Sequence, residues 1–66
     1  MRVTVNGIER DVRDGATIAD LLALLGVAPD GIAVACNDRV VRRALYGEHR
    51  VGQGDRVEII KAVAGG

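Results

Sequence analysis

A single amphipathic helix, in a chain otherwise made of strand-like segments, is the feature that most restricts how this sequence can fold. Thr17 is a suitable helix N-cap with Asp20 three residues later, and Gly26 followed by Pro29 marks the end of the helix. Between them, apolar residues recur at the spacing of one helical face: Ile18, Leu21, Leu22 and Leu25. A helix this short covers one face of a sheet and no more.

The N-terminal segment predicts a β-hairpin. Polar and apolar residues alternate from Arg2 to Val5, and Asn6-Gly7 suits a type I′ turn, in which both central residues take positive φ. The return strand is expected from Ile8 to Arg13. Regular alternation puts Arg10 on the same face as Val3. Either Arg10 lies at the margin of the sheet with its stem along apolar surface, or a bulge shifts the register.

Three more strand-like segments follow the helix. Ile32 to Cys36 is an apolar run typical of a buried strand, Arg39 to Arg42 predicts a short edge strand protected by charge, and Arg56 to Val63 predicts the last strand. The stretch from Arg43 to Gly54 is punctuated by glycine and predicted to be irregular. This order predicts an α+β fold, a mixed five-stranded sheet packed on one helix, which is the β-grasp arrangement. A right-handed crossover through the helix is expected to place the third strand parallel to the first.

Composition excludes several classes of protein. Nine Lys and Arg balance nine Asp and Glu, and Tyr46 is the only aromatic residue, so the chain lacks the basic surface and the stacking side chains of a nucleic-acid binder. Cys36 and His49, the only Cys and His, cannot form a four-ligand zinc site, and a lone Cys fits a reducing compartment. Without a signal-peptide pattern or an apolar stretch of membrane-spanning length, the expected location is the cytoplasm, with no membrane partner.

The candidate reactive residues favour structural roles. Cys36 lies in an apolar run and is expected to be a buried small hydrophobe, and His49 has no nucleophile at a defined spacing. Gly52 to Asp55 lacks the features of a phosphate-binding loop and is expected to be a turn. A pocket of catalytic size would consume the small core, so no catalytic residue is expected. Five arginines leave two interpretations open, a basic patch for an acidic partner or charged protection of edge strands: Arg39, Arg42, Arg43, Arg50 and Arg56.

The strongest functional pattern lies at the end of the sequence, where the last predicted strand runs into small residues instead of a polar turn. Because glycine lacks a Cβ, Ala64-Gly65-Gly66 can pass through a narrow channel and present a carboxylate to a partner enzyme. A frayed terminus of small residues is the plain alternative. We therefore expect a β-grasp domain over residues 1–62 and a flexible Gly-Gly tail over residues 63–66.

Over nearly its whole length the sequence resembles the ThiS family, the ubiquitin-like β-grasp sulfur carriers of thiamine biosynthesis. The terminal segment is the specific part of the resemblance, and the hairpin and helix alone would be weak evidence. The matching segments are Asn6-Gly7, TIADLL at 17–22, Ala33 to Asn37, GQGDRVEI at 52–59 and AVAGG at 62–66.

The resemblance implies a mechanism and its partners. An E1-like adenylyltransferase, using ATP and magnesium, would activate the Gly66 carboxylate, and sulfur from a cysteine desulfurase system would replace AMP to leave a thiocarboxylate. The tail residues Val63, Ala64 and Gly65 would carry Gly66 into thiazole synthase, which receives the sulfur. The chain itself would be a carrier and not an enzyme, and would bind no cofactor or metal.

Two alternatives stay open because a Gly-Gly end is common to related carriers. One is a sulfur carrier for another pathway, such as molybdopterin or cysteine formation. The other is a ubiquitin-like modifier joined to lysines of other proteins, or a non-catalytic interaction domain. A genomic neighbourhood that contains thiazole synthase would favour the thiamine pathway over another sulfur pathway, and the chemical fate of Gly66 separates a sulfur carrier from a modifier.

Overall fold

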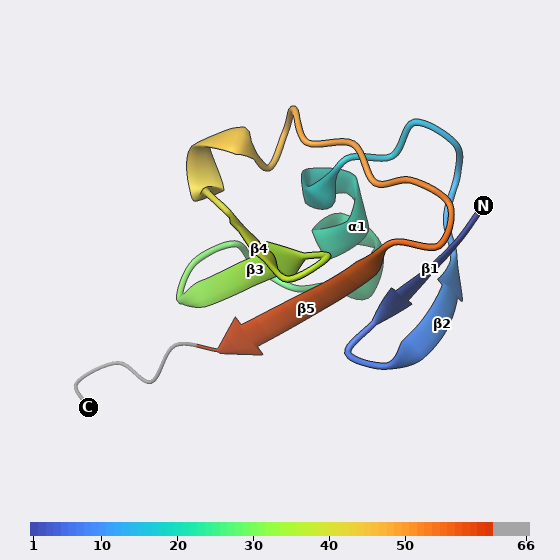
Figure 1. The fold of residues 1–66 in the computed structure, drawn as a ribbon. Coiled ribbons are helices and arrows are strands. Elements are labelled where there is room, and N and C mark those ends of the chain that lie inside the picture. The colour runs from blue at the N-terminus through green and yellow to red at the C-terminus, as the bar shows by residue number, and fades with distance from the viewer. Residues whose placement is uncertain (62–66) are drawn as a thin grey trace.

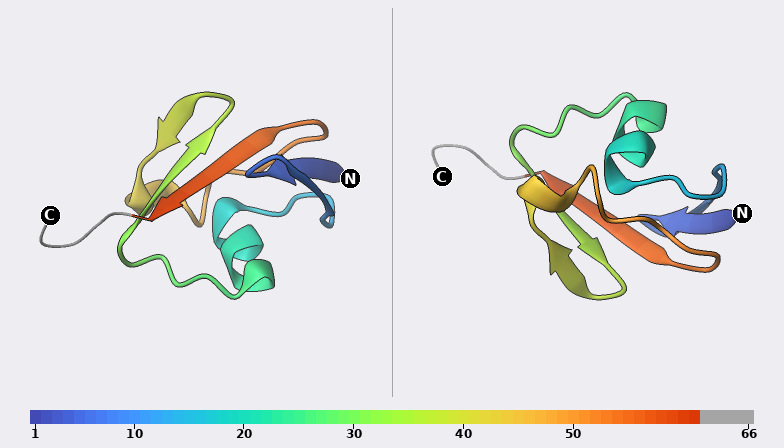
Figure 2. Two further views of the ribbon diagram at one scale, coloured as in Figure 1. Left: turned by 90° about the horizontal axis from the view of Figure 1, so that it is seen from below. Right: turned by 90° about the horizontal axis from the view of Figure 1, so that it is seen from above.

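A mixed five-stranded sheet packs one of its faces against a single α-helix in the computed structural model, which describes residues 1–61 (Figure 1). The helix α1 lies across one face of the sheet and leaves the other uncovered (Figure 2). The strands lie in the order β2-β1-β5-β3-β4, which makes β5 the central strand. The elements are β1 (Arg2–Val5), β2 (Ile8–Asp11), α1 (Ile18–Leu25), β3 (Ile32–Cys36), β4 (Arg39–Val41), the 3₁₀ helix η1 (Arg43–Leu45) and β5 (Arg56–Lys61).

The β1–β2 hairpin has the predicted turn and an unbroken register. Asn6 and Gly7 have φ of 50° and 82°, as a type I′ turn requires. Val3 pairs with Arg10 with no bulge between them. Of the two alternatives for Arg10 the first is confirmed, because its side chain is exposed at the edge of the sheet on the same face as Val3. Strand β2 ends at Asp11, two residues before the predicted end.

The strand directions correct one prediction. Strand β5 runs parallel to β1, and β3 runs antiparallel to β5, so β3 is antiparallel to β1. The expectation that the third strand would be parallel to the first was wrong. The crossover rule applies to the strand that the chain leaves, which is β2, and β2 itself runs opposite to β1. Strand β3 is therefore parallel to β2, and β1 finds its parallel partner in β5.

Both ends of α1 are stabilised as predicted. The Asp20 amide donates to Thr17 Oγ1 at 3.2 Å, and the Thr17 amide donates to Asp20 Oδ2 at 3.0 Å, which completes a capping box. The bond from the Thr17 amide is the main reason why the pKa of Asp20 is lowered. At the other end Gly26 has a φ of 70°, and the Val27 amide donates to the Leu22 carbonyl oxygen.

The core lies between α1 and the inner face of the sheet. Among the described residues every buried side chain is apolar apart from the Tyr46 phenol, and no charged side chain is buried. Leu25, which completes the predicted helical stripe, is only half-buried. The buried residues are Val3, Val5, Val12, Ala16, Ile18, Leu21, Leu22, Val34, Cys36, Val41, Tyr46, Val51 and Val57.

The connection from β4 to β5, predicted to be irregular, contains η1 and packs beside the start of α1. The Ile18 amide donates to the His49 carbonyl oxygen at 2.9 Å, and the Ala19 amide donates to the Tyr46 carbonyl oxygen at 2.8 Å. The first amides of a helix have no partner within the helix. The connection therefore satisfies amides that the capping box leaves open, and Tyr46 closes the core beneath it.

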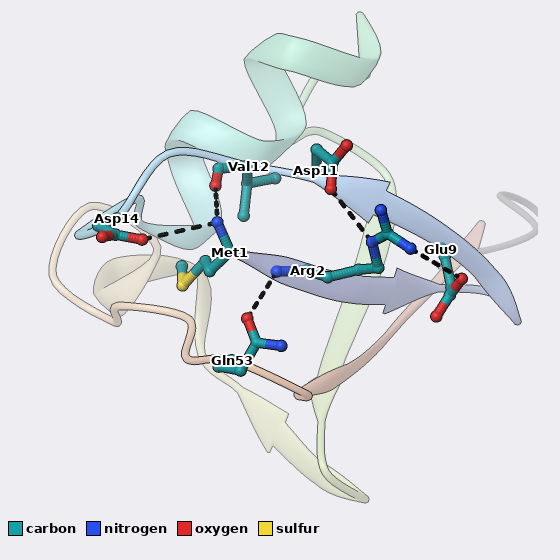
Figure 3. Close-up of polar contacts among 7 residues, drawn as sticks. All are labelled: Met1, Arg2, Glu9, Asp11, Val12, Asp14 and Gln53. Carbon is teal, nitrogen blue, oxygen red and sulfur yellow. Dashed lines mark hydrogen bonds and ion pairs between the residues drawn. The ribbon is translucent and has the colours of Figure 1, made fainter.

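Polar contacts join β1 to β2 and to the turn before β5 (Figure 3). The Arg2 amide donates to Gln53 Oε1 at 2.8 Å, which ties β1 to that turn. The Arg2 guanidinium lies 3.2 Å from Asp11 Oδ1 and 3.5 Å from Glu9 Oε1, and the hydrogen bond to Asp11 is the main cause of its raised pKa. Such exposed ion pairs contribute little to stability, so the backbone ladder and not these pairs joins β1 to β2.

Candidate functional site

Exposed apolar side chains gather on the face of the sheet that α1 leaves uncovered. Val40 is 77% exposed and Ile60 is 58% exposed. The strand register places Ile60 opposite Ala33, and places Ala35 between Val40 and Glu58. We call these five residues the outer patch. Its two alanines lie on β3, between the larger side chains of β4 and β5, so the patch combines four apolar side chains with the carboxylate of Glu58.

The outer patch was missed in the sequence, although a pattern for it exists. Val40-Val41 and Ile59-Ile60 are apolar doublets within strands, and successive strand residues point to opposite faces. One member of each doublet must therefore face away from the core. Val41 and Ile59 face inward, which leaves Val40 and Ile60 outside.

Strand β5 leads from the outer patch toward the predicted reactive residues, and it is held on both sides. It pairs with β1 on one side and with β3 on the other, where the register extends to Ile32 opposite Lys61. Beyond the β1 ladder, the Ile59 amide donates to Asn6 Oδ1 at 2.8 Å, and Asn6 Nδ2 donates to the Ile59 carbonyl oxygen at 3.2 Å. The Asn6 side chain thus acts as one more peptide unit of β1.

The predicted tail, residues 63–66, follows Lys61 after a single residue. Residues 62–66, and with them Val63, Ala64, Gly65, Gly66 and the expected domain boundary after residue 62, lie outside the described residues. Five residues span at most about 18 Å of extended chain. Whatever holds the end of β5 therefore sets the region that Gly66 can reach.

Cys36 has the environment of an unreactive thiol. Its side chain is buried, and Sγ lies 3.7 Å from Asp55 Oδ2, to which the thiol donates. Burial, followed by the neighbouring Asp55 carboxylate, raises the pKa of the Cys36 thiol. A protonated, inaccessible thiol is a poor nucleophile. The prediction that Cys36 is buried is confirmed.

Asp55 closes the predicted Gly52–Asp55 turn and joins it to the β3–β4 turn. Its Oδ2 accepts from the Gly52 amide at 2.7 Å and its Oδ1 accepts from Asn37 Nδ2 at 3.0 Å. Asn37 Oδ1 in turn accepts from the Arg56 amide at 2.9 Å. Partial burial works to raise the pKa of Asp55, but the bonds from Asn37 and Gly52 outweigh it and hold the pKa below its usual value.

The five arginines do not form a single uncompensated basic patch. Arg43 pairs with Asp30, and Arg56 pairs with Asp38 at 2.9 Å. The other three, Arg39, Arg42 and Arg50, are exposed and form no ion pair among residues 1–61. Arg39 begins the edge strand β4, where protection by charge is the simpler interpretation.

The part of the chain that the structure describes contains neither a cluster of metal-ligating side chains nor a helix that could cross a membrane. Within residues 1–61, no group of three or more His, Cys, Asp and Glu side chains is arranged to hold a metal ion. His49 is half-buried in the connection to β5. No helix in residues 1–61 has the length and apolar character needed to cross a membrane.

Comparison with known proteins decides the family. Residues 3–66 match the family model described as the ThiS family. The chain belongs to the ThiS family. Sulfur carrier protein ThiS of Escherichia coli (strain K12) is 30% identical over 66 residues, which cover all of both chains. The crystal structure of the thiamine biosynthesis protein ThiS from Geobacter metallireducens matches with a TM-score of 0.87 and 32% identity, and again covers all of both chains. The family resemblance and the ubiquitin-like β-grasp fold are confirmed.

A second kind of relative is much longer. A thiazole synthase of Magnetococcus marinus is 35% identical to this chain over 66 residues. That match covers all of this chain but 20% of the thiazole synthase. The chain thus spans about a fifth of the length of the thiazole synthases that it matches.

Proposed function

We propose that this chain is a sulfur carrier of thiamine biosynthesis, which holds sulfur as a thiocarboxylate on Gly66 and donates it to thiazole synthase. The observation that carries the proposal is the ThiS-family match over residues 3–66, which includes the AVAGG segment. The full-length similarity to the E. coli sulfur carrier protein supports it. The chain acts as a carrier and not as an enzyme.

The proposed chemistry takes place on Gly66 and is performed by partners. An E1-like adenylyltransferase joins the Gly66 carboxylate to the α-phosphate of ATP, with magnesium on the phosphates, and pyrophosphate leaves. A persulfide from a cysteine desulfurase system then displaces AMP to give an acyl disulfide. A second thiol attacks the donor cysteine sulfur, forms a disulfide with it and releases the thiocarboxylate. Adenylation is needed because a carboxylate is a poor electrophile, whereas the thiocarboxylate is a strong sulfur nucleophile.

The chain contributes a docking surface and a fixed base for the tail. The outer patch exposes the apolar side chains of Val40 and Ile60 on either side of β3, and grouped exposed apolar side chains mark protein interfaces. It adjoins β5, the strand that leads to Val63, Ala64 and Gly65. Cys36 is kept protonated and buried, so it does not compete for the sulfur. ATP and magnesium belong to the adenylyltransferase.

Thiazole synthase is the favoured sulfur acceptor because of the longer relatives. The Magnetococcus thiazole synthase contains a segment similar to the whole of this chain, so carrier-like and synthase sequences are covalently joined there. Such a connection keeps donor and acceptor at high effective concentration. We also propose that the carrier and the synthase are both located in the cytoplasm, where thiols stay reduced.

The decisive experiment follows the intact mass of the chain. The protein is incubated with the adenylyltransferase of its own organism, magnesium-ATP and a sulfur source, and one carboxylate oxygen should be replaced by sulfur. A variant without Gly66 should stay unchanged, while Cys36→Ala should still be converted. An unchanged wild-type mass with an active adenylyltransferase contradicts the carrier function. Linkage of Gly66 to lysines supports the modifier, and a thiocarboxylate that thiazole synthase does not consume supports another pathway.

A further inference from the structure

An open groove of about 450 Å³ lies on the inner side of the sheet, where β5 approaches its end. It runs between the β1–β2 turn, the C-terminal end of α1 and the start of β3. We call it the end groove. Four apolar residues and two cations of its lining carry the argument: Ile8, Leu25, Ile32, Ile59, Arg10 and Lys61.

The end groove exists because α1 is too short to cover this part of the sheet. An eight-residue helix is about 12 Å long. It buries the centre of the inner face, but Ile8 on the edge strand β2 remains 60% exposed. Leu25, Ile32 and Ile59 are half-buried against the core. Apolar surface in the groove is thus left for an apolar side chain to cover.

The charged side chains that line the end groove are all positive. Arg10 and Lys61 line it, and none of its lining residues carries a carboxylate. Among residues 1–61 neither cation lies within ion-pair distance of a carboxylate, whereas Arg2 and Arg13 are paired. The groove is therefore complementary to an acidic partner surface.

One wall of the end groove is already rigid. The Asn6 side chain, which belongs to the lining, is bonded to both backbone polar groups of Ile59. These bonds fix the β1–β2 turn against β5. Binding to a preformed surface avoids the entropy cost of ordering it.

From these observations, and resting on the proposed function, we propose that the end groove docks an acidic segment of thiazole synthase. An apolar side chain of that segment covers Ile8 and its neighbours, and its carboxylates face Arg10 and Lys61. Ile59 and Lys61 border the groove, whereas Ile60, between them in the sequence, belongs to the outer patch on the other face of the sheet. A synthase that contacts both surfaces holds β5 from its two faces, and this fixes the point from which Gly66 is delivered.

The test measures the affinity of the full-length chain for the thiazole synthase of its own organism by calorimetry. Arg10→Glu reverses one charge of the groove, and Arg50→Glu is the matched control in the connection to β5. We expect Arg10→Glu to weaken binding about tenfold at low ionic strength, with a smaller loss in high salt. Ile8→Ser should weaken binding at both ionic strengths, and Arg50→Glu should stay within about twofold of the wild type. Thermal unfolding of each variant verifies that it is folded.

The outer-patch variant Val40→Asp separates this inference from the proposed function. If Val40→Asp abolishes binding while Arg10→Glu and Ile8→Ser bind as the wild type does, the groove inference is wrong and the carrier function stands. If the wild-type chain does not bind the synthase, both are wrong. The free chain is also compared with a form ending at Lys61 by NMR. A change at the Ile8 amide shows that the chain's own tail occupies the groove, and a concentration-dependent change shows that a second copy does; either result overturns the inference.

Discussion

Asn6 is expected to stabilise the base of the tail in two separable ways. It takes a φ of 50° in the hairpin turn, and its side chain bonds the Ile59 amide and carbonyl groups at 2.8 Å and 3.2 Å. Asn6→Ala removes both contributions. A left-handed conformation costs an alanine about 1 kcal/mol, and each exposed hydrogen bond contributes about 0.5–1 kcal/mol, so the variant should lose about 2–3 kcal/mol.

Asn6→Gly is the matched control, because glycine tolerates positive φ but cannot bond Ile59. The missing bonds should cost Asn6→Gly about 1–2 kcal/mol and the greater freedom of the unfolded chain about 0.5 kcal/mol, so this variant should remain about 0.5 kcal/mol more stable than Asn6→Ala. A chain of 66 residues has a total free energy of unfolding of about 3–10 kcal/mol. Both losses are therefore measurable by urea denaturation followed by circular dichroism.

Hydrogen exchange at the Ile59 amide provides a second, local measurement. Its protection should fall in both variants by more than global destabilisation explains, because its acceptor is the missing Asn6 Oδ1. Equal stability of the Ala and Gly variants would refute the conformational argument. A Gly variant as stable as the wild type, with Ile59 still protected, would refute the role of the side-chain bonds.

Three further predictions concern other contacts. Thr17→Ala should lower the free energy of unfolding, measured by urea denaturation, by about 1 kcal/mol, and Thr17→Ser should lower it by a fraction of that. Equal losses in the two variants would contradict the capping role of the Thr17 hydroxyl. Because the pKa of Asp55 is lowered on folding, its stabilisation is present above the unfolded pKa near 4 and is lost as pH falls through the folded value. Between about pH 5 and pH 2, the denaturation midpoint of Asp55→Asn should therefore change less than that of the wild type. If the midpoints of the two proteins change in parallel with pH, this linkage is excluded. Cys36 should react with a thiol reagent slowly at about pH 8 in the native chain and rapidly after unfolding, and fast native labelling would contradict its raised pKa.

Features set by local chemistry could be predicted from the sequence. The Asn6-Gly7 turn and the Thr17–Asp20 capping box each depend on a few neighbouring residues, and the structure contains both. The direction of β3 was predicted wrongly because it depends on which earlier strand serves as the reference for the crossover. The 3₁₀ helix η1 has no pattern of its own in the sequence, and the residues after it, Tyr46 and His49, bond to the start of α1, which is distant in the sequence.

Part of the candidate site could likewise be predicted from the sequence, and part of it could not. The AVAGG segment could be recognised from the sequence because the chemistry proposed for it depends only on small residues and a carboxyl group. The two surfaces beside β5 could not, since each combines residues from several strands. The outer patch combines Val40 and Ile60 across β3, and the end groove joins Arg10 of β2 to Lys61 of β5. Such neighbours exist only once the strand order is known.

The position of β5 in the sheet explains why a carrier proposed to react at Gly66, five residues beyond Lys61, needs a folded domain before its tail. A partner that draws Gly66 into an active site pulls on the strand that precedes it, and an edge strand could be peeled away one hydrogen bond at a time. Strand β5 is central, with β1 and the Asn6 side chain on one side and β3 on the other as far as Lys61. Detaching it requires both ladders to break, so its local stability approaches that of the whole domain. The binding energy of a partner is then available to position the tail within its reach of about 18 Å, instead of unfolding the strand that holds it.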